Sequence, residues 1–84
     1  MSTLSAPRDE EIARLRVPPH SIEAEQSVLG GLLIDNSAWD RAADLVSDHD
    51  FYRLEHRLIF QAVGKLITAG KPADVITVHE ELSL

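Results

Sequence analysis

The sequence of 84 residues predicts a small all-α domain, an orthogonal bundle of about four helices at roughly 21–35, 37–47, 53–69 and 77–84. Three observations support this fold class. Apolar residues recur at the i, i+3, i+4 and i+7 spacing of amphipathic helices. Residues that favour helix N-caps precede several of these segments. Proline and glycine mark the places where a helix cannot continue. Residues 1–17 mix serine, proline and charges, and are predicted to form a flexible leader.

The first helix, residues 21–35, is the element around which the other helices are expected to pack. Pro18 and Pro19 prevent a helix from entering from upstream, and Ser21 is a suitable N-cap. Two acidic residues in the first turn suit the positive end of the helix dipole. Five apolar residues form its buried side: Ile22, Val28, Leu29, Leu32 and Leu33.

A carboxylate within this apolar stripe, that of Glu25, needs a partner. A general acid with a raised pKa is one interpretation. The sequence offers no second catalytic group, so we favour a structural carboxylate held by Arg57, His56, Tyr52 or backbone N–H groups. Glu25 is then expected to tie the first helix to the helix at 53–69.

Small residues line a different face of the first helix, at Ala24, Ser27 and Gly31. A glycine inside a helix costs about 1 kcal/mol relative to alanine. Gly30 and Gly31 follow one another, which predicts that another helix approaches closely at this point.

The second helix, residues 37–47, is short. Ser37 and Asp40 have the spacing of a capping box, with aspartate in place of the usual glutamate or glutamine. Trp39 is expected to point inward as a packing residue, because it opens a run of apolar residues at helical spacing. That run continues with Ala42, Ala43 and Val46.

The third helix, residues 53–69, carries an apolar face so broad that more than one neighbour must cover it. Gly70 and Pro72 follow it in the positions that end a helix. His56 lies on the apolar side and is interpreted as a core histidine rather than a ligand. The face comprises Leu58, Ile59, Phe60, Ala62, Val63, Leu66 and Ile67.

The last helix is predicted to begin at Val78 after an extended link of residues 74–76. Thr77 and Glu80 have capping-box spacing. Only about two turns would fit before Leu84, and such a short helix does not hold itself together. The sequence therefore predicts a domain that is incomplete at its C-terminal end.

Charge and composition exclude several classes of function. The net charge of −6 lies wholly outside the neutral leader, so the body is a poor candidate for nucleic-acid binding. A protein partner with a basic surface and a merely solvated acidic surface both remain open. There is no cysteine, no signal peptide and no run long enough to cross a membrane, which favours a cytoplasmic protein.

No motif for a catalytic, cofactor or metal site emerges. Gly64-Lys65 lacks the upstream glycine and the following serine or threonine of a P-loop. His49 lies between two aspartates, and we interpret this trio as a turn rather than a metal site.

One long run nevertheless points to a family. The residues PPHSIEAEQSVLGGLL at 18–33, then DFY at 50–52, HRxIF at 56–60 and GKPxDVIT at 70–77, closely resemble the N-terminal domain of the DnaB family of replicative helicases. The resemblance implies that residues 18–84 belong to an all-helical collar domain. It stops before the last helices of the head and before the helical hairpin that would follow.

The family resemblance also implies partners. Such proteins form ring hexamers that move 5′ to 3′ on single-stranded DNA, driven by a separate C-terminal motor that uses ATP and magnesium. The collar assembles subunits and receives the C-terminal region of primase and helicase loaders. These 84 residues would then hold no catalytic group. The other hypothesis is a free-standing helical adaptor that mimics the collar to bind primase or a loader.

Eleven residues are expected to be structural in such a domain, and no partner-contacting residue is assigned. They are Ser21, Glu25, Leu29, Gly31, Leu33, Trp39, His56, Ile59, Phe60, Val63 and Thr77.

Overall fold

The computed structural model describes residue 12 and residues 21–83, and these residues form helices and turns without a strand. The elements are α2 (Ile22–Ile34), a 3₁₀ turn η2 (Asn36–Ala38), α3 (Trp39–Leu45), a second 3₁₀ turn η3 (Asp48–Asp50), α4 (Leu54–Thr68) and α5 (Val75–Leu82). The predicted all-α class is confirmed.

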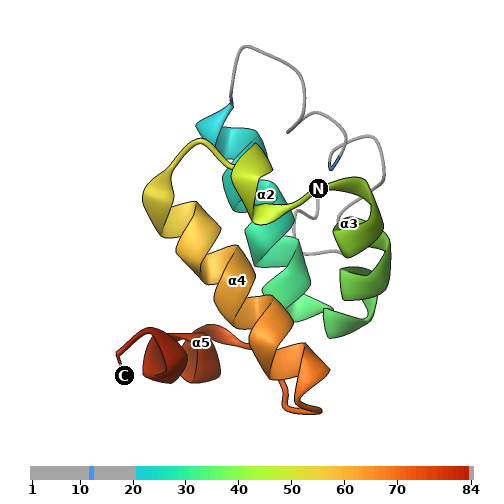
Figure 1. Cartoon of the computed structure of the whole chain (residues 1–84), viewed down its shortest axis with the longest axis vertical. Helices are drawn as coiled ribbons and strands as arrows, with labels where there is room; N and C mark the ends of the chain where they lie inside the picture. Colours follow the sequence, from blue (N-terminus) through green and yellow to red (C-terminus); the bar gives the residue numbers. More distant parts are fainter. Residues whose placement is uncertain (1–11, 13–20, 84) are drawn as a thin grey trace.

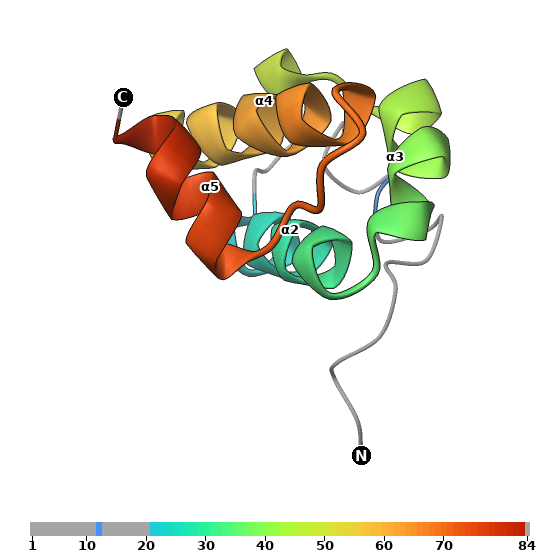
Figure 2. The ribbon, with the colours of Figure 1, turned by 90° about the horizontal axis from the view of Figure 1, so that it is seen from below.

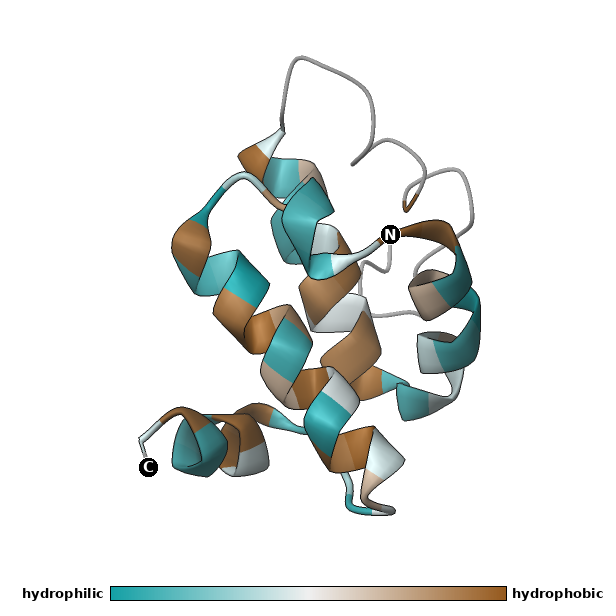
Figure 3. Ribbon diagram, in the orientation of Figure 1, coloured by the Kyte–Doolittle hydropathy of each residue, from teal (hydrophilic) through white to brown (hydrophobic). Residues whose placement is uncertain are grey.

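Two long helices, α2 and α4, lie side by side at the centre of the molecule (Figure 1). Seen from below, α4 lies above α2, with α5 on one side of this pair and α3 on the other (Figure 2). Brown and teal segments alternate along the ribbons, as expected for amphipathic helices that share one core (Figure 3). None of the described helices is long and apolar enough to cross a membrane.

Helix α2 begins where the sequence predicts. The Ser21 hydroxyl caps it by accepting a hydrogen bond from the Ala24 N–H at 3.1 Å. The expected close approach of a helix along the small residues is not found at two of them. Ser27 is exposed, and a Cβ added at Gly30 would meet no atom within 4 Å. Gly31 is buried.

The segment predicted as one helix over 37–47 divides into η2 and α3. The predicted capping box of Ser37 and Asp40 is wrong, because Asp35 takes the capping role. Its carboxylate accepts the Ser37 N–H at 3.0 Å, which tightens the chain into a 3₁₀ turn. Helix α3 then starts with no side-chain cap.

Helix α4 matches its predicted bounds within one residue and ends as expected. Gly70 has a φ of 76°, the left-handed conformation that glycine adopts without strain. The Gly70 N–H binds the Ile67 carbonyl and the Lys71 N–H binds the Leu66 carbonyl, both at 2.9 Å. These two bonds form a Schellman motif.

Helix α5 begins three residues earlier than predicted, at Val75 rather than Val78. The capping box that we assigned to Thr77 and Glu80 belongs to Asp74 and Thr77. The Thr77 N–H donates to the Asp74 carboxylate at 2.9 Å, and the Thr77 hydroxyl receives the Asp74 N–H at 2.8 Å. Thr77 is therefore the third residue of the helix instead of its cap.

The core joins all four helices and one residue from far upstream. Ile12 is helical and fully buried in the same apolar cluster. The rest of the predicted leader, residues 1–17, lies outside the described part of the chain. The buried apolar side chains are Ile12, Val28, Leu29, Leu32, Ala38, Ala42, Val46, Phe51, Phe60, Ala62, Val63, Leu66, Ala73 and Val78.

The broad apolar face of α4 is only partly covered by the described residues. Leu58 is 42% exposed, and Leu54 one turn earlier is 65% exposed. Val75 and Ile76 at the start of α5 are each 71% exposed.

Candidate functional site

A buried carboxylate links the two central helices. Glu25 of α2 is 1% exposed, and its Oε1 lies 2.7 Å from Nδ1 of His56 on α4. Because a carboxylate can only accept, Nδ1 must carry the hydrogen. The other oxygen, Oε2, accepts the backbone N–H of Tyr52 at 2.6 Å, and Oε1 receives a longer bond of 3.4 Å from the Arg53 N–H.

These contacts hold Glu25 in its charged form. Burial by itself would raise the pKa of Glu25, but the hydrogen bonds from the Tyr52 N–H, the His56 ring and the Arg53 N–H outweigh that effect. The pKa of this carboxyl group is therefore below its ordinary value. A general acid needs a raised pKa, so Glu25 is not suited to that role. Its hydrogen bonds make it a structural anchor between α2 and α4.

The anchor fixes the loop that leads into α4. Arg57, which we considered as a partner of Glu25, instead donates from Nε to the Phe51 carbonyl at 2.7 Å. Tyr52 contributes its backbone N–H to Glu25, while its side chain is exposed. Phe51 is thus locked into the core, where its ring lies 5.0 Å from that of Phe60.

A second polar link, through Asn36, was not predicted from the sequence. Its side-chain amide donates to the carbonyls of Leu32 and Ala73, both at 2.8 Å, and its oxygen accepts the Ala73 N–H at 2.9 Å. Asn36 therefore joins the end of α2 to the loop before α5, 37 residues away. The sequence signalled only a turn residue, because the partner is a backbone group brought close by the fold.

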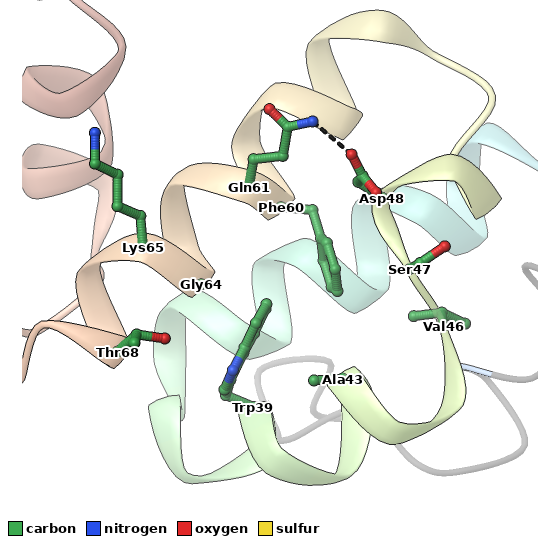
Figure 4. Close-up of a pocket in the computed structure, with 10 residues that line it drawn as sticks. All are labelled: Trp39, Ala43, Val46, Ser47, Asp48, Phe60, Gln61, Gly64, Lys65 and Thr68. Carbon is green, nitrogen blue, oxygen red and sulfur yellow. Dashed lines mark hydrogen bonds between the residues drawn. The ribbon is translucent and has the colours of Figure 1, made fainter.

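A hollow of about 400 Å³ lies between α3 and α4 (Figure 4), and we name it the α3–α4 hollow. The Trp39 ring from α3 and the Phe60 ring from α4 point toward each other there, with centroids 4.8 Å apart. Its lining residues are Trp39, Ala43, Val46, Ser47, Asp48, Phe60, Gln61, Gly64, Lys65 and Thr68.

Gly64 makes the close contact with Trp39 possible. A Cβ at position 64 would lie 2.6 Å from Cζ2 of the indole, which is closer than real Cβ atoms come to their neighbours. A close approach not predicted from the sequence is therefore found at Gly64, where α4 meets an aromatic ring. The only signal in the sequence was a glycine inside a strongly helical segment.

The edge of the α3–α4 hollow is polar. Gln61 donates from its amide to the Asp48 carboxylate (Figure 4), and this bond lowers the pKa of Asp48. Lys65 points away from the hollow toward α5, where its Nζ lies 2.7 Å from a carboxylate oxygen of Glu81.

The structure places the eleven expected structural residues unevenly. Six are buried: Glu25, Leu29, Gly31, His56, Phe60 and Val63. Five are only partly buried: Ser21, Leu33, Trp39, Ile59 and Thr77. The hydrogen bonds and ring contacts bring together Glu25 with His56 and Trp39 with Phe60.

Among the described residues, no group of three or more histidine, cysteine, aspartate or glutamate side chains is arranged to hold a metal ion. His49 lies in η3 with its side chain 85% exposed and 3.9 Å from Asp48. Asp50 closes this turn by accepting the Ser47 N–H at 2.8 Å.

Comparison with known proteins places this chain among the N-terminal domains of DnaB-like helicases. Residues 17–84 match the model of the DnaB-like helicase N-terminal domain. The chain is 54% identical over 72 residues, 86% of its length, to the replicative DNA helicase DnaB of Buchnera aphidicola subsp. Acyrthosiphon pisum. It is 53% identical over 66 residues, 79% of its length, to the same helicase of Pasteurella multocida, and 42% identical over 73 residues, 87% of its length, to that of Geobacillus stearothermophilus. The matched region covers only 16%, 14% and 16% of the lengths of these three relatives, respectively.

Proposed function

Because the chain belongs to the family of DnaB-like helicase N-terminal domains, we propose that it is the collar module of a replicative helicase. Its work is assembly of the helicase ring and docking of other replication proteins. ATP hydrolysis and 5′ to 3′ movement on DNA then belong to a separate motor region, with ATP and magnesium bound there. The family match over residues 17–84 is the observation that carries this proposal.

The charge of the chain and its exposed apolar side chains support a role in binding other proteins. The acidic body, with a net charge of −6 for the whole chain, is unsuited to neutralising phosphates. Large apolar side chains are exposed on α4 and α5, including Leu54, Val75 and Ile76. Such side chains are typical of surfaces that meet other proteins.

The buried polar links suit an assembly domain because they fix the relative positions of its helices. Glu25 joins α2 to α4, and Asn36 joins α2 to the loop before α5. A surface built on four helices keeps its shape only if these helices cannot slide, and directional hydrogen bonds prevent sliding.

Calorimetric titration of the 84-residue chain with the C-terminal domain of primase tests the docking role. We expect saturable heat from a sample that circular dichroism shows to be helical and that melts cooperatively. Absence of heat from such a folded sample, together with absence of binding to a helicase loader, contradicts the proposal. Sedimentation of the whole helicase tests ring assembly, for which we expect a hexamer.

A further inference from the structure

We propose that the α3–α4 hollow is a docking site for a basic amphipathic helix of a partner protein, which inserts an apolar side chain against Trp39. This inference rests on the proposed docking role and adds to it a surface and the chemistry of the occupant.

The floor of the hollow is suited to an apolar side chain. Trp39 and Phe60 line it with aromatic rings, and Ala43 of α3 and Val46 just after that helix add apolar side chains (Figure 4). The volume of about 400 Å³ is within the range of protein sites that bind ligands. The indole packs directly against Gly64 of α4, and Trp39 as a whole is only partly buried, so part of this side chain remains exposed in the hollow.

The side of the hollow formed by α3 is acidic. Successive residues of a helix are rotated by about 100°, so Asp40 and Asp44 follow Ala43 around α3 on its solvent side. Both aspartates are exposed, and within the described part of the chain neither forms an ion pair or a hydrogen bond through its side chain. Asp48 adds a further carboxylate to the lining.

The charge on the opposite side does not balance this acidity. Lys65 is the basic residue in the lining, and its ammonium group is paired with Glu81 on α5. Arg41 adds one positive charge to α3 next to Asp40, so together with Asp48 the three carboxylates still outnumber Arg41 and the paired Lys65. This excess of negative charge attracts a basic partner and repels phosphates and acidic segments.

An amphipathic helix matches the apolar floor of the hollow and the acidic side formed by Asp40 and Asp44. Such a helix places apolar residues at i, i+3, i+4 and i+7 on one side, with basic residues next to them. When one apolar side chain enters the hollow, the flanking lysines or arginines face Asp40 and Asp44.

Trp39 makes the site directly observable, because it is the only tryptophan of the chain. The probe is a synthetic peptide of about 18 residues with leucine at helical spacing and lysine elsewhere, longer than the roughly 12–15 residues below which isolated helices are marginal in water. A peptide with glutamate in place of every lysine is the control. We expect the lysine peptide to shift the emission of Trp39 saturably and the glutamate peptide to leave it unchanged.

Two variants locate the binding. Ala43→Arg places a bulky positive side chain at an exposed position of the hollow and is expected to abolish the emission change. The double variant Asp40→Asn, Asp44→Asn is expected to weaken binding about threefold or more, with a shallower dependence on salt. Its matched control, Glu23→Gln with Glu80→Gln, removes the same charge outside the hollow and is expected to stay within about twofold of the unchanged chain.

Several outcomes overturn the inference. One is equal binding of the lysine and glutamate peptides, and another is unchanged binding by Ala43→Arg. A third is an emission change that follows the concentration of the chain alone and disappears in Ala43→Arg, which would assign the hollow to a second copy.

The same variants separate this inference from the proposed function. If primase or a loader binds the unchanged chain and the Ala43→Arg variant equally while the peptide does not bind, the docking role stands and the α3–α4 hollow is not its surface. If the lysine peptide binds at the hollow but neither replication protein binds, the hollow stands and the proposed collar role fails.

Discussion

Replacement of Glu25 by glutamine tests the buried anchor. The carboxylate accepts two short hydrogen bonds, at 2.6 Å from the Tyr52 N–H and at 2.7 Å from the His56 ring. Hydrogen bonds to charged groups contribute about 1.5–3 kcal/mol each, so about 3–6 kcal/mol is involved. Glutamine keeps the shape and one acceptor oxygen but loses the charge. We expect the free energy of unfolding to fall by about 2 kcal/mol, since part of the bonding survives.

Thermal unfolding followed by circular dichroism measures this loss. For a domain of this size, about 2 kcal/mol corresponds to a decrease in Tm of about 8–16 °C. Glu23→Gln is the matched control, because Glu23 lies in the same first turn of α2 but is exposed. Both variants remove one acid from the positive end of the helix dipole, so the difference between their Tm values reports the buried contacts of Glu25 alone.

The dependence on pH gives a second signature. The pKa of Glu25 is lower in the folded chain than its ordinary value of 4.5, so acid protonates the unfolded chain first. The stabilisation is therefore present above about pH 4.5 and is lost as the pH falls through the folded pKa. We expect the difference in Tm between the unchanged chain and Glu25→Gln to be largest near neutral pH and to shrink below pH 4.5. A variant as stable as the Glu23→Gln control at pH 7, or a difference that does not change with pH, would refute the anchor.

Three further substitutions, two of them with a matched control, test other contacts, each measured by urea unfolding. Asn36→Ala removes three hydrogen bonds between α2 and the loop before α5, and is expected to cost about 2 kcal/mol; a loss below about 0.5 kcal/mol contradicts the link. Gly64→Ala is expected to lower the free energy of unfolding by about 1–3 kcal/mol, because the added Cβ would lie 2.6 Å from the indole. The Cβ added by Gly30→Ala would meet no atom within 4 Å, so this control is expected to raise the free energy of unfolding by up to about 1 kcal/mol. Asp74→Ala is expected to lower the free energy of unfolding by about 1 kcal/mol and to reduce the helical signal, because Asp74 caps α5. Glu80→Ala is expected to change neither quantity, and equal effects of the two substitutions would contradict the assignment of the cap to Asp74.

The sequence by itself determined the helices whose signals are local. The Ser21 cap and the ending of α4 at Gly70 need only residues within one turn of each other, and both are found where expected. The apolar stripes likewise follow from the period of the helix, which fixes the faces of α2 and α4 before any neighbour is known. The family of the chain was also recognisable from the run at 18–33, and the comparison with known proteins confirms it.

Competition between nearby caps was harder to resolve from the sequence. Asp35 and Ser37 both suit an N-cap, as do Asp74 and Thr77, and the two members of each pair are two or three residues apart. The aspartate caps in both places, and the serine or threonine donates its backbone N–H to it. The difference between such alternatives is about 1 kcal/mol or less, which packing of the following helix easily decides.

Only the tertiary structure decided the contacts between residues distant in the chain. Glu25 meets the Tyr52 N–H, Asn36 meets Ala73, and Gly64 meets Trp39. Two of these partners are backbone groups, which every residue carries, so no residue type in the sequence marks them. The α3–α4 hollow likewise exists only because two helices with separate apolar stripes leave space beside an aromatic pair. Periodicity therefore specifies the helices and their faces, while the crossing of those faces creates the site.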